Sequence, residues 1–285
     1  MSQASGAYPG AGDFLAGMAA SSRARSAAAQ AKLPEPELRL RLRDFPPAPA
    51  LDFDVFDLIA EVKLRSPAVG LLKAADREDV GARVSAYARA GAAAVSILTE
   101  PSRFDGSLED LEKGARALLP LGVPAMRKDF IVDRYQVLEG RYAGAGGVLA
   151  ILRMIPRADL EQVIDTALEQ GMFVLLEAFD EPDIELANSL LQARGAHRER
   201  LLVGVNSRDL VTLKVVPGRL DEMASRLPRG FRRVAESGVA TAEDAARAAR
   251  NGYDLALVGS ALMSAADPAA LAREMLSAAR SVKRT

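Results

Sequence analysis

A glutamate and a lysine share one face of the first predicted strand of this 285-residue chain. Residues 57–70 read DLIAEVKLRSPAVG, so an apolar run leads directly into Glu61 and Lys63. Because side chains alternate along a strand, Ile59, Glu61 and Lys63 point to the same side. A strand with both faces covered is expected to be apolar on both. The pair is therefore a structural ion pair, the wet face of an edge strand, or part of a site for acid–base chemistry.

The composition restricts which side chains could carry such chemistry. The chain has no cysteine and one histidine, His197, which lies among arginines in ARGAHRER and is predicted to be a solvated loop residue. This leaves no basis for a disulfide, a cysteine nucleophile, a Cys/His zinc site or a Ser-His-Asp triad. If the protein is an enzyme, its proton transfers must use lysine, glutamate, aspartate or tyrosine.

The charge balance and hydropathy argue against nucleic acid and membranes as partners. With 37 Lys and Arg against 38 Asp and Glu, the formal net charge is -1, so no overall field attracts an anionic polymer or surface. The sequence has no run of about 18 apolar residues, and its N-terminus lacks the pattern of a secretory signal. We therefore expect a cytoplasmic protein whose partner is a small molecule.

One supersecondary unit repeats from Asp57 onward. Short apolar runs alternate with helix-compatible segments, several of which begin at N-cap residues and end in glycine. The eight runs are LIAEVK (58–63), AAVSIL (93–98), VPAMRK (123–128), GGVLAIL (146–152), MFVLLEA (172–178), LLVGVN (201–206), RRVAES (232–237) and DLALVG (254–259). Such alternation predicts βαβ units and a parallel sheet. Eight units in roughly 230 residues predict an α/β fold, the (β/α)8 TIM barrel. The alternative, a doubly wound open sheet, lacks support because no GxGxxG follows the first strand.

Residues 1–56 lie outside this repeat, and we expect an N-terminal helical extension that packs on a barrel of residues 57–285. The segment FLAGMAASSRARSAAAQAK predicts an amphipathic helix. The apolar face of that helix would carry Phe14, Leu15, Met18 and Ala19. The Pro-rich stretch LPEPELRLRLRDFPPAPALD then leads into the barrel, so the extension has one or two helices, with a disordered tail at its start up to Gly12.

Polar residues follow nearly every predicted strand at its carboxyl end. In this fold those ends, with the loops that follow, form the functional face of the barrel. A barrel interior filled only for stability would carry Val, Ile and Leu there, so the convergence of charges predicts a site. In chain order, these residues are Glu61, Lys63 and Ser66; Thr99 and Glu100; Arg127, Lys128, Asp129 and Phe130; Glu177; Asn206, Arg208 and Asp209; Glu236 and Ser237.

The seventh and eighth predicted strands end differently, in ESGVAT and VGSALM. Ser237, Gly238, Gly259 and Ser260 provide hydroxyls and accessible backbone N–H groups just before a helix begins. In (β/α)8 barrels, the loops after strands seven and eight commonly bind phosphate with helix N-termini behind them. We therefore expect a substrate that carries a phosphate.

These residues lie in motifs that resemble those of the indole-3-glycerol phosphate synthase family, in order across the whole barrel. The motifs are IAEVKLRSP (59–67), VSILTE with FDGS (95–107), RKDFI (127–131), LLEA (175–178), VGVNSRDL (203–210), AESGV (235–239) and LVGSALM (257–263). The N-terminal MAASSRARSAAA is similar to the family's extension. As a set, these motifs are highly specific, although any one of them alone is not.

The resemblance implies a carboxy-lyase of tryptophan biosynthesis that acts on 1-(2-carboxyphenylamino)-1-deoxyribulose 5-phosphate. CO₂ and water would be released and indole-3-glycerol phosphate formed, without a metal or an organic cofactor. The family's general acid corresponds to Lys128, and its second active-site lysine, near the substrate carboxylate, to Lys63. Its catalytic carboxylates correspond to Glu61 and Glu177, and its hydrogen-bonding asparagine to Asn206.

The resemblance also implies which residues hold the substrate. Phe130 corresponds to an aromatic residue of the anthranilate pocket, and Gly238, Gly259 and Ser260 correspond to the phosphate cradle. The substrate- and phosphate-binding residues expected here are Ser66, Phe130, Arg208, Glu236, Ser237, Gly238, Gly259 and Ser260.

The chain departs from the family's pattern at three places. Ala68 follows the SP dipeptide where the family commonly has Ser, and the fourth strand reads GGVLAILRM instead of the more usual DAILLI. Ala178 and Phe179 follow Glu177 where Val-His is common. Every matched catalytic residue is present, so these departures concern the fit of the substrate.

Elementary chemistry is consistent with a lysine as the acid, because ring closure onto a carbonyl needs a proton donor at the developing alkoxide. A second lysine nearby lowers the pKa of a buried lysine, and adjacent carboxylates raise it, so the sequence leaves the direction open. Glu61, Glu177 and Lys63 could share the later proton transfers.

Two other functions are compatible with the sequence. Another phosphate-binding barrel, such as a phosphoribosylanthranilate isomerase-like protein, would use a Cys/Asp or Asp/Asp pair, which the lysine-rich centre disfavours. A non-catalytic paralogue that binds a sugar phosphate would need only the phosphate cradle, whereas both lysines and both glutamates are retained here. The sequence has no glutaminase pattern or second barrel, so we expect a monofunctional monomer that could associate weakly with pathway enzymes.

Overall fold

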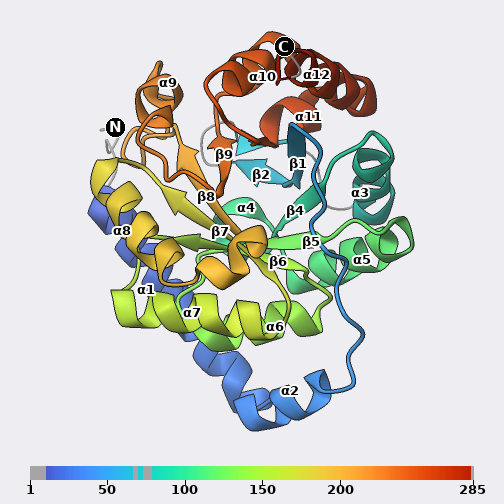
Figure 1. The fold of residues 1–285 in the computed structure, drawn as a ribbon. Helices are drawn as coiled ribbons and strands as arrows, with labels where there is room; N and C mark the ends of the chain where they lie inside the picture. The colour runs from blue at the N-terminus through green and yellow to red at the C-terminus, as the bar shows by residue number, and fades with distance from the viewer. Residues whose placement is uncertain (1–10, 67–69, 73–78, 284–285) are drawn as a thin grey trace, which may run out of the picture.

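Parallel strands close into a barrel in the computed structural model, which describes residues 11–66, 70–72 and 79–283 (Figure 1). The eight strands are β1 (Asp57–Val62), β4 (Ala94–Leu98), β5 (Ala125–Lys128), β6 (Gly147–Ile151), β7 (Phe173–Ala178), β8 (Leu201–Asn206), β9 (Arg232–Glu236) and β10 (Leu255–Val258). β1 pairs with both β4 and β10, which closes the sheet. The predicted (β/α)8 barrel is thereby confirmed, and the open sheet is wrong.

The observed strands lie at the predicted apolar runs, with boundaries that shift by one or two residues. β1 ends at Val62, so Lys63 lies just beyond it. β5 begins only at Ala125, because Pro124 has no N–H to donate to a neighbouring strand. Its carbonyl still accepts a hydrogen bond from the backbone N–H of Val95.

Helices cover the outside of the barrel between successive strands (Figure 1). They are α3 (Val80–Arg89), α5 (Leu108–Leu118), α6 (Arg134–Tyr142), α7 (Arg157–Glu169), α8 (Glu181–Gln192), α9 (Arg219–Ala224), α10 (Ala242–Arg250) and α12 (Pro268–Lys283). Several helices begin at N-cap residues, as expected: the side chains of Asp79, Ser107 and Thr241 each accept a backbone N–H three residues later. After α3 and α6 the chain turns at Gly91 and Gly144, whose positive φ angles of 102° and 94° favour glycine.

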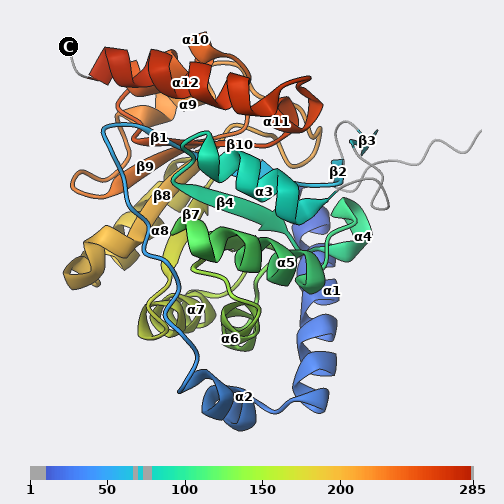
Figure 2. The same cartoon turned by 90° about the vertical axis from the view of Figure 1, so that its right-hand side faces the viewer.

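Helices α1 (Ala11–Lys32) and α2 (Glu35–Leu42) precede the barrel. In Figure 2, α1 crosses the end of the barrel toward which the β4 arrow points, beside the short helix α4 (Pro101–Phe104). The predicted apolar face of α1 packs against the barrel, with Leu15, Met18 and Ala19 buried. Residues 1–10, which belong to the predicted tail, lie outside the described residues, and the division of the chain at residue 56 stays a prediction.

Several small elements were not predicted from the sequence. β2 (Arg65–Ser66) and β3 (Gly70–Leu71) pair as an antiparallel hairpin after β1, and α11 (Ser260–Ser264) follows β10. Short 3-10 helices occupy Leu119–Leu121 and Gly195–Arg200; His197 lies in the second and is exposed, as expected. Within the described residues, no helix has the length and apolarity needed to cross a bilayer.

Candidate active site

A pocket of about 310 Å³ opens at the carboxyl ends of the barrel strands. Residues from α1, from the strand ends and from the loops after them line it. Of the predicted site residues, it brings together Glu61, Lys63, Lys128, Phe130, Glu177, Asn206, Arg208, Glu236, Ser237, Gly238, Gly259 and Ser260. Ser66 is the exception: its backbone pairs with Gly70 in the β2–β3 hairpin, and its side chain is not among those described.

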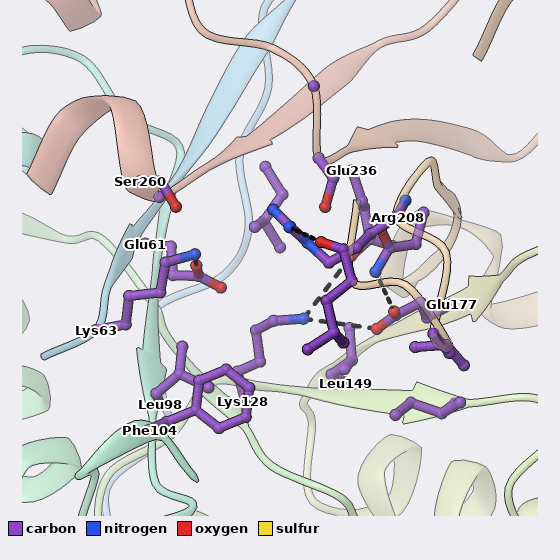
Figure 3. Close-up of a pocket in the computed structure, with 18 of the residues that line it drawn as sticks. Glu61, Lys63, Leu98, Phe104, Lys128, Leu149, Glu177, Arg208, Glu236 and Ser260 are labelled. Atoms are coloured by element: carbon purple, nitrogen blue, oxygen red, sulfur yellow. Dashed lines mark hydrogen bonds and ion pairs between the residues drawn. The ribbon is translucent and has the colours of Figure 1, made fainter. Parts of the chain in front are cut away.

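Glu61 and Lys63 face this pocket and form an ion pair, with Lys63 Nζ 2.6 Å from Glu61 Oε1 (Figure 3). Strand alternation directs them inward, and Gly259 on the adjoining strand end makes room: a Cβ there would lie 2.2 Å from Glu61 Oε1. Burial raises the pKa of Glu61, but attraction to Lys63 and Lys128 outweighs it, and the net pKa is lowered. Glu61 is therefore a carboxylate at neutral pH.

Lys128, the last residue of β5, extends toward two buried carboxylates (Figure 3). Its Nζ lies 3.5 Å from Glu177 Oε2 and 3.9 Å from Glu236 Oε2. Burial lowers the pKa of Lys128, but attraction to Glu177, Glu236 and Glu61 raises it above the ordinary lysine value. The direction that the sequence left open is therefore set by the carboxylates, and the ammonium form is present at neutral pH.

Glu236, at the end of β9, is the least satisfied of these carboxylates. It is only 1% exposed, and neither of its carboxylate oxygens has a hydrogen-bond partner in the described residues. Burial, together with repulsion from Glu177, raises its pKa well above the ordinary glutamate value. Gly204 on β8 leaves the space that it occupies, because a Cβ there would lie 2.0 Å from Glu236 Oε1.

Asn206 and Arg208 extend the polar side of the pocket. The Asn206 side-chain amide donates to Glu177 Oε1 at 2.6 Å, and Asn206 Oδ1 accepts the backbone N–H of Arg208 at 2.9 Å. Arg208 Nη1 donates to the carbonyl of Leu213 at 2.6 Å, and burial lowers the pKa of this guanidinium. The hydrogen bond from Asn206 holds one oxygen of Glu177, so the second oxygen of this carboxylate faces Lys128.

Small residues that follow β9 and β10 form another part of the pocket wall. Ser237 and Gly238 after β9 both have positive φ angles, 64° and 78°, and Ser260 begins α11 (Figure 3). A left-handed conformation is costly for a serine, roughly 1 kcal/mol, and such strain is concentrated at functional sites. Backbone N–H groups and hydroxyls in this part of the wall could hold an anion such as a phosphate.

Apolar side chains form a third wall, and much of it was not predicted. Phe104 and Phe14 pack around Phe130, with ring centroids 6.2 and 6.0 Å away, respectively. The apolar lining comprises Phe14, Leu15, Leu98, Phe104, Phe130, Leu149, Ile151, Phe179, Leu210, Leu213 and Val215. The sequence placed Phe14 and Leu15 on the packed face of a helix, but gave no signal that this helix reaches the pocket.

The departures from the family pattern are partly located in the same wall. Leu149 and Ile151 of the altered fourth strand and Phe179 after Glu177 all line the pocket. The Arg153 guanidinium lies 5.1 Å from the centroid of the Phe179 ring and pairs with Asp183. These residues therefore bear on the fit of a substrate. Ala68 is outside the described residues.

Some polar strand ends serve the scaffold instead of the pocket. The Glu100 carboxylate accepts the backbone N–H groups of Ser102 and Arg103 and thereby caps α4. Asp209 likewise accepts backbone N–H groups within its own exposed loop. Arg127 leaves β5 on the face opposite to Lys128 and is buried outside the barrel. Thr99 does not line the pocket either, and its hydroxyl donates to Asp129 at 2.7 Å. The expectation that these ends all converge on one site was wrong for these four residues, because alternation and capping turn them away.

The arrangement combines a protonated lysine, carboxylates with free oxygens, a group of small residues with accessible backbone N–H groups, and an aromatic wall. It can donate a proton to an oxygen of a bound substrate and accept one elsewhere on it. Within the described residues, no group of three or more His, Asp or Glu side chains is placed to hold a metal ion.

The family model for indole-3-glycerol phosphate synthase matches residues 19–275 of this chain. An indole-3-glycerol phosphate synthase from Nocardioides sp. is 44% identical over 218 residues, covering 76% of this chain and 79% of that protein. The enzyme of the same name from Methanopyrus kandleri is 41% identical over 228 residues, covering 79% and 85%. The relative from Leifsonia xyli is 41% identical over 233 residues, covering 80% and 84%.

Solved structures with little sequence identity share the fold. 3-Hexulose-6-phosphate synthase from Salmonella typhimurium superposes with a TM-score of 0.60 at 18% identity, covering 80% of this chain and 100% of that one. Thiamine phosphate pyrophosphorylase from Pyrococcus furiosus gives 0.55 at 14% identity, covering 80% and 96%. These two similarities concern the barrel alone, whereas the family match and the relatives near 40% identity show that the chain belongs to the indole-3-glycerol phosphate synthase family.

Proposed function

We propose that this protein closes the indole ring of indole-3-glycerol phosphate, with loss of CO₂ and water, and that Lys128 is the general acid. The observation that carries the proposal is the position of the Lys128 ammonium, 3.5 and 3.9 Å from two buried carboxylates at the centre of the pocket. Membership of the indole-3-glycerol phosphate synthase family supports the reaction. The polar side, the small residues and the apolar wall of the pocket support the roles that we assign to individual residues.

In the first step, Lys128 protonates the ribulose carbonyl oxygen while the carboxylate-bearing carbon of the aromatic ring attacks the carbonyl carbon. The raised pKa of Lys128 keeps its proton in place until negative charge develops on that oxygen. The ammonium then stabilises the developing alkoxide and transfers its proton to it. CO₂ leaves from the attacking ring carbon, and the bonding electrons return to the aromatic ring.

The second half of the reaction removes the new hydroxyl as water. It needs an acid at the hydroxyl and a base for the proton of the adjoining carbon. Glu61 and Lys63 form a close pair at 2.6 Å, and Glu177 has one oxygen free of hydrogen bonds, so these three residues supply the acid and the base.

The three walls of the pocket fit the three parts of the substrate. The aromatic wall around Phe130 receives the anthranilate ring, and Arg208 and Glu236 bind polar groups of the substrate. Ser66 stays a predicted substrate-binding residue on the resemblance to the family alone. The phosphate lies at the end formed by Ser237, Gly238, Gly259 and Ser260. The proposed working unit is a monomer, with at most weak association with pathway enzymes. We also propose a cytoplasmic location, supported by the cysteine-free composition.

The test is to add 1-(2-carboxyphenylamino)-1-deoxyribulose 5-phosphate to the purified protein and follow indole fluorescence. The chain contains no tryptophan, so its own emission in this range is small. Lys128→Ala should fold, as judged by circular dichroism, but lose on the order of 10²-fold or more in turnover. The matched control is Lys113→Ala on the exposed surface of α5, which should retain wild-type turnover.

Two results would contradict the proposal in different ways. Full activity of a folded Lys128→Ala variant would show that another group is the acid. Saturable binding of the substrate by the wild-type protein without any rise in fluorescence would identify a sugar-phosphate-binding paralogue.

A further inference from the structure

A second cavity, of about 640 Å³, lies at the end of the barrel opposite to the active-site pocket. It is built around the chain segments that enter β1, β8, β9 and β10. β9 separates the two sites, because Arg232 at its start lines this cavity and Glu236 at its end lines the pocket. Four residue steps along a strand span about 13 Å, so a molecule here does not reach the substrate. The cavity is lined by Leu51, Asp52, Phe53, Arg198, Glu199, Arg229, Gly230, Phe231, Arg232, Arg233, Gly252 and Asp254.

Four of these lining residues are arginines. Within the described part of the chain, no hydrogen bond or ion pair engages the guanidinium of Arg198 or Arg229. Arg232 is held in place by the Phe53 ring, whose centroid lies 4.9 Å from the guanidinium carbon. Arg233 Nη2 donates to the carbonyl of Leu227 at 3.3 Å, which fixes its direction. The cavity is therefore surrounded by two guanidinium groups with fixed positions, Arg232 and Arg233, and by those of Arg198 and Arg229, which no described residue engages.

Three carboxylates line the cavity, and none of them forms a short ion pair with its arginines. Asp52 accepts the backbone N–H of Phe53 at 2.9 Å. Asp254 pairs with Lys283 at 2.7 Å and also accepts the backbone N–H of Arg233, so only a long contact of 3.9 Å connects it to Arg232. Glu199 has its ion-pair contact with Arg200, at 3.9 Å. The arginines consequently retain donors that no carboxylate of the described residues fills.

We propose that this cavity binds a phosphorylated small molecule through Arg198, Arg229 and Arg232. The planar guanidinium fork matches the oxygens of a phosphate and binds it with two parallel hydrogen bonds. Small-molecule sites commonly have volumes of about 300–1,000 Å³, so a cavity of 640 Å³ has room for more than a lone phosphate ion. The proposed role of this cavity is binding alone.

Glycine-selective ¹⁵N labelling can separate this cavity from the active site in one titration. The chain has 22 glycines; Gly230 and Gly252 line the cavity, and Gly238 and Gly259 line the pocket. Inorganic pyrophosphate, added at constant ionic strength with NaCl, should shift the Gly230 and Gly252 amide signals saturably. Signals from the pocket glycines report separately on the phosphate end of the active site, so the two proposals can fail independently.

Variants then test the arginines themselves. Arg198→Ala and Arg229→Ala should each weaken pyrophosphate binding at Gly230 and Gly252 about tenfold, the usual cost of losing a charge-assisted hydrogen bond. The control Arg116→Ala removes an equally charged but remote side chain, which is exposed and paired with Glu112, and should leave the affinity unchanged. Turnover of all three variants should equal that of the wild type.

Three outcomes would overturn the proposal. One is the absence of a saturable shift at Gly230 and Gly252. Another is an equal loss of affinity in Arg116→Ala, which would show general attraction of an anion to a charged surface. The third is a response of these signals to an acidic peptide but not to pyrophosphate, which would identify a protein partner instead.

Discussion

Arg127 and Lys128 are neighbours on β5, and the structure satisfies their charges very differently. Arg127 is 1% exposed, and its guanidinium donates to the carbonyl of Gln136 at 2.7 Å and to Glu139 at 2.8 Å. It also donates to Asp129 at 3.2 Å. Lys128 is one residue later, and its ammonium is less closely paired: the nearest carboxylate oxygen, Glu177 Oε2, lies 3.5 Å away.

The difference follows from strand alternation and from what covers each face. On the outer face, α6 and α1 enclose Arg127 and Asp129; Arg25 of α1 binds the Asp129 carboxylate with two hydrogen bonds of 2.8 and 2.9 Å. On the inner face the pocket leaves carboxylate oxygens of Glu177 and Glu236 without partners. Buried charges with short hydrogen bonds to one another fix the structure, whereas carboxylates with unpartnered oxygens leave capacity for a ligand.

The outer cluster should be the more sensitive of the two to loss of its cation. Arg127→Met leaves Asp129 and Glu139 without their shared partner and should lower the free energy of unfolding by about 3–5 kcal/mol. Lys128→Met should lower it less, because water in the open pocket can hydrate the carboxylates that remain. Urea unfolding monitored by circular dichroism measures both. An equal or greater loss in Lys128→Met would remove the distinction between the clusters.

Acid should weaken the outer cluster through Asp129. Burial raises the pKa of Asp129, but its hydrogen bond with Arg25 and the charge of Arg127 outweigh this and hold the pKa at about 2. The unfolded value is about 3.9, so the carboxylate contributes stability above that pH and loses it as the pH falls toward 2. The contribution at neutral pH is roughly 2–3 kcal/mol.

Asp129→Asn isolates this contribution from the other carboxylates. The difference in unfolding free energy between wild type and variant should be constant from pH 7 to about 5 and shrink between about pH 4 and 2. Urea titrations across this range measure the difference. A difference that stays constant down to pH 2 would show that Asp129 is not held ionised by its partners.

The barrel could be predicted because its signal is local and repeated. Each unit carries an apolar run of strand length, an N-cap residue such as Ser107 and a glycine such as Gly91 after the helix, and the number of units determines closure. The pocket residues could be predicted because the carboxyl ends of parallel strands must meet. Neither inference needs knowledge of contacts between distant residues.

The remaining features depend on such contacts. The sequence predicted that α1 packs through Leu15 and Met18, but its passage across the pocket involves contacts between distant residues, such as the ion pair of Arg25 with Asp129, 104 residues away. The pKa of Lys128 depends on a balance between burial and three carboxylates that lie on different strands. Glu100 was grouped with the site because its role as a helix cap becomes visible only when α4 is known.

A final comparison lies within the pocket, between Glu236 and Glu61. The folded-state pKa of Glu236 is raised by burial and by Glu177, so its ionised form costs stability as the pH rises through that value. Glu236→Gln should therefore be more stable than the wild type at pH 8 by roughly 1–2 kcal/mol, and the gain should vanish near pH 4, where the carboxyl is neutral in both states.

Glu61, whose pKa is lowered chiefly by Lys63, is the matched control: Glu61→Gln should be less stable than the wild type at pH 8. Chemical denaturation of the three proteins at both pH values measures these differences. A gain in stability for both substitutions would show that burial outweighs the lysines at both carboxylates, and a loss for both would show that the lysines outweigh burial at Glu236 as well.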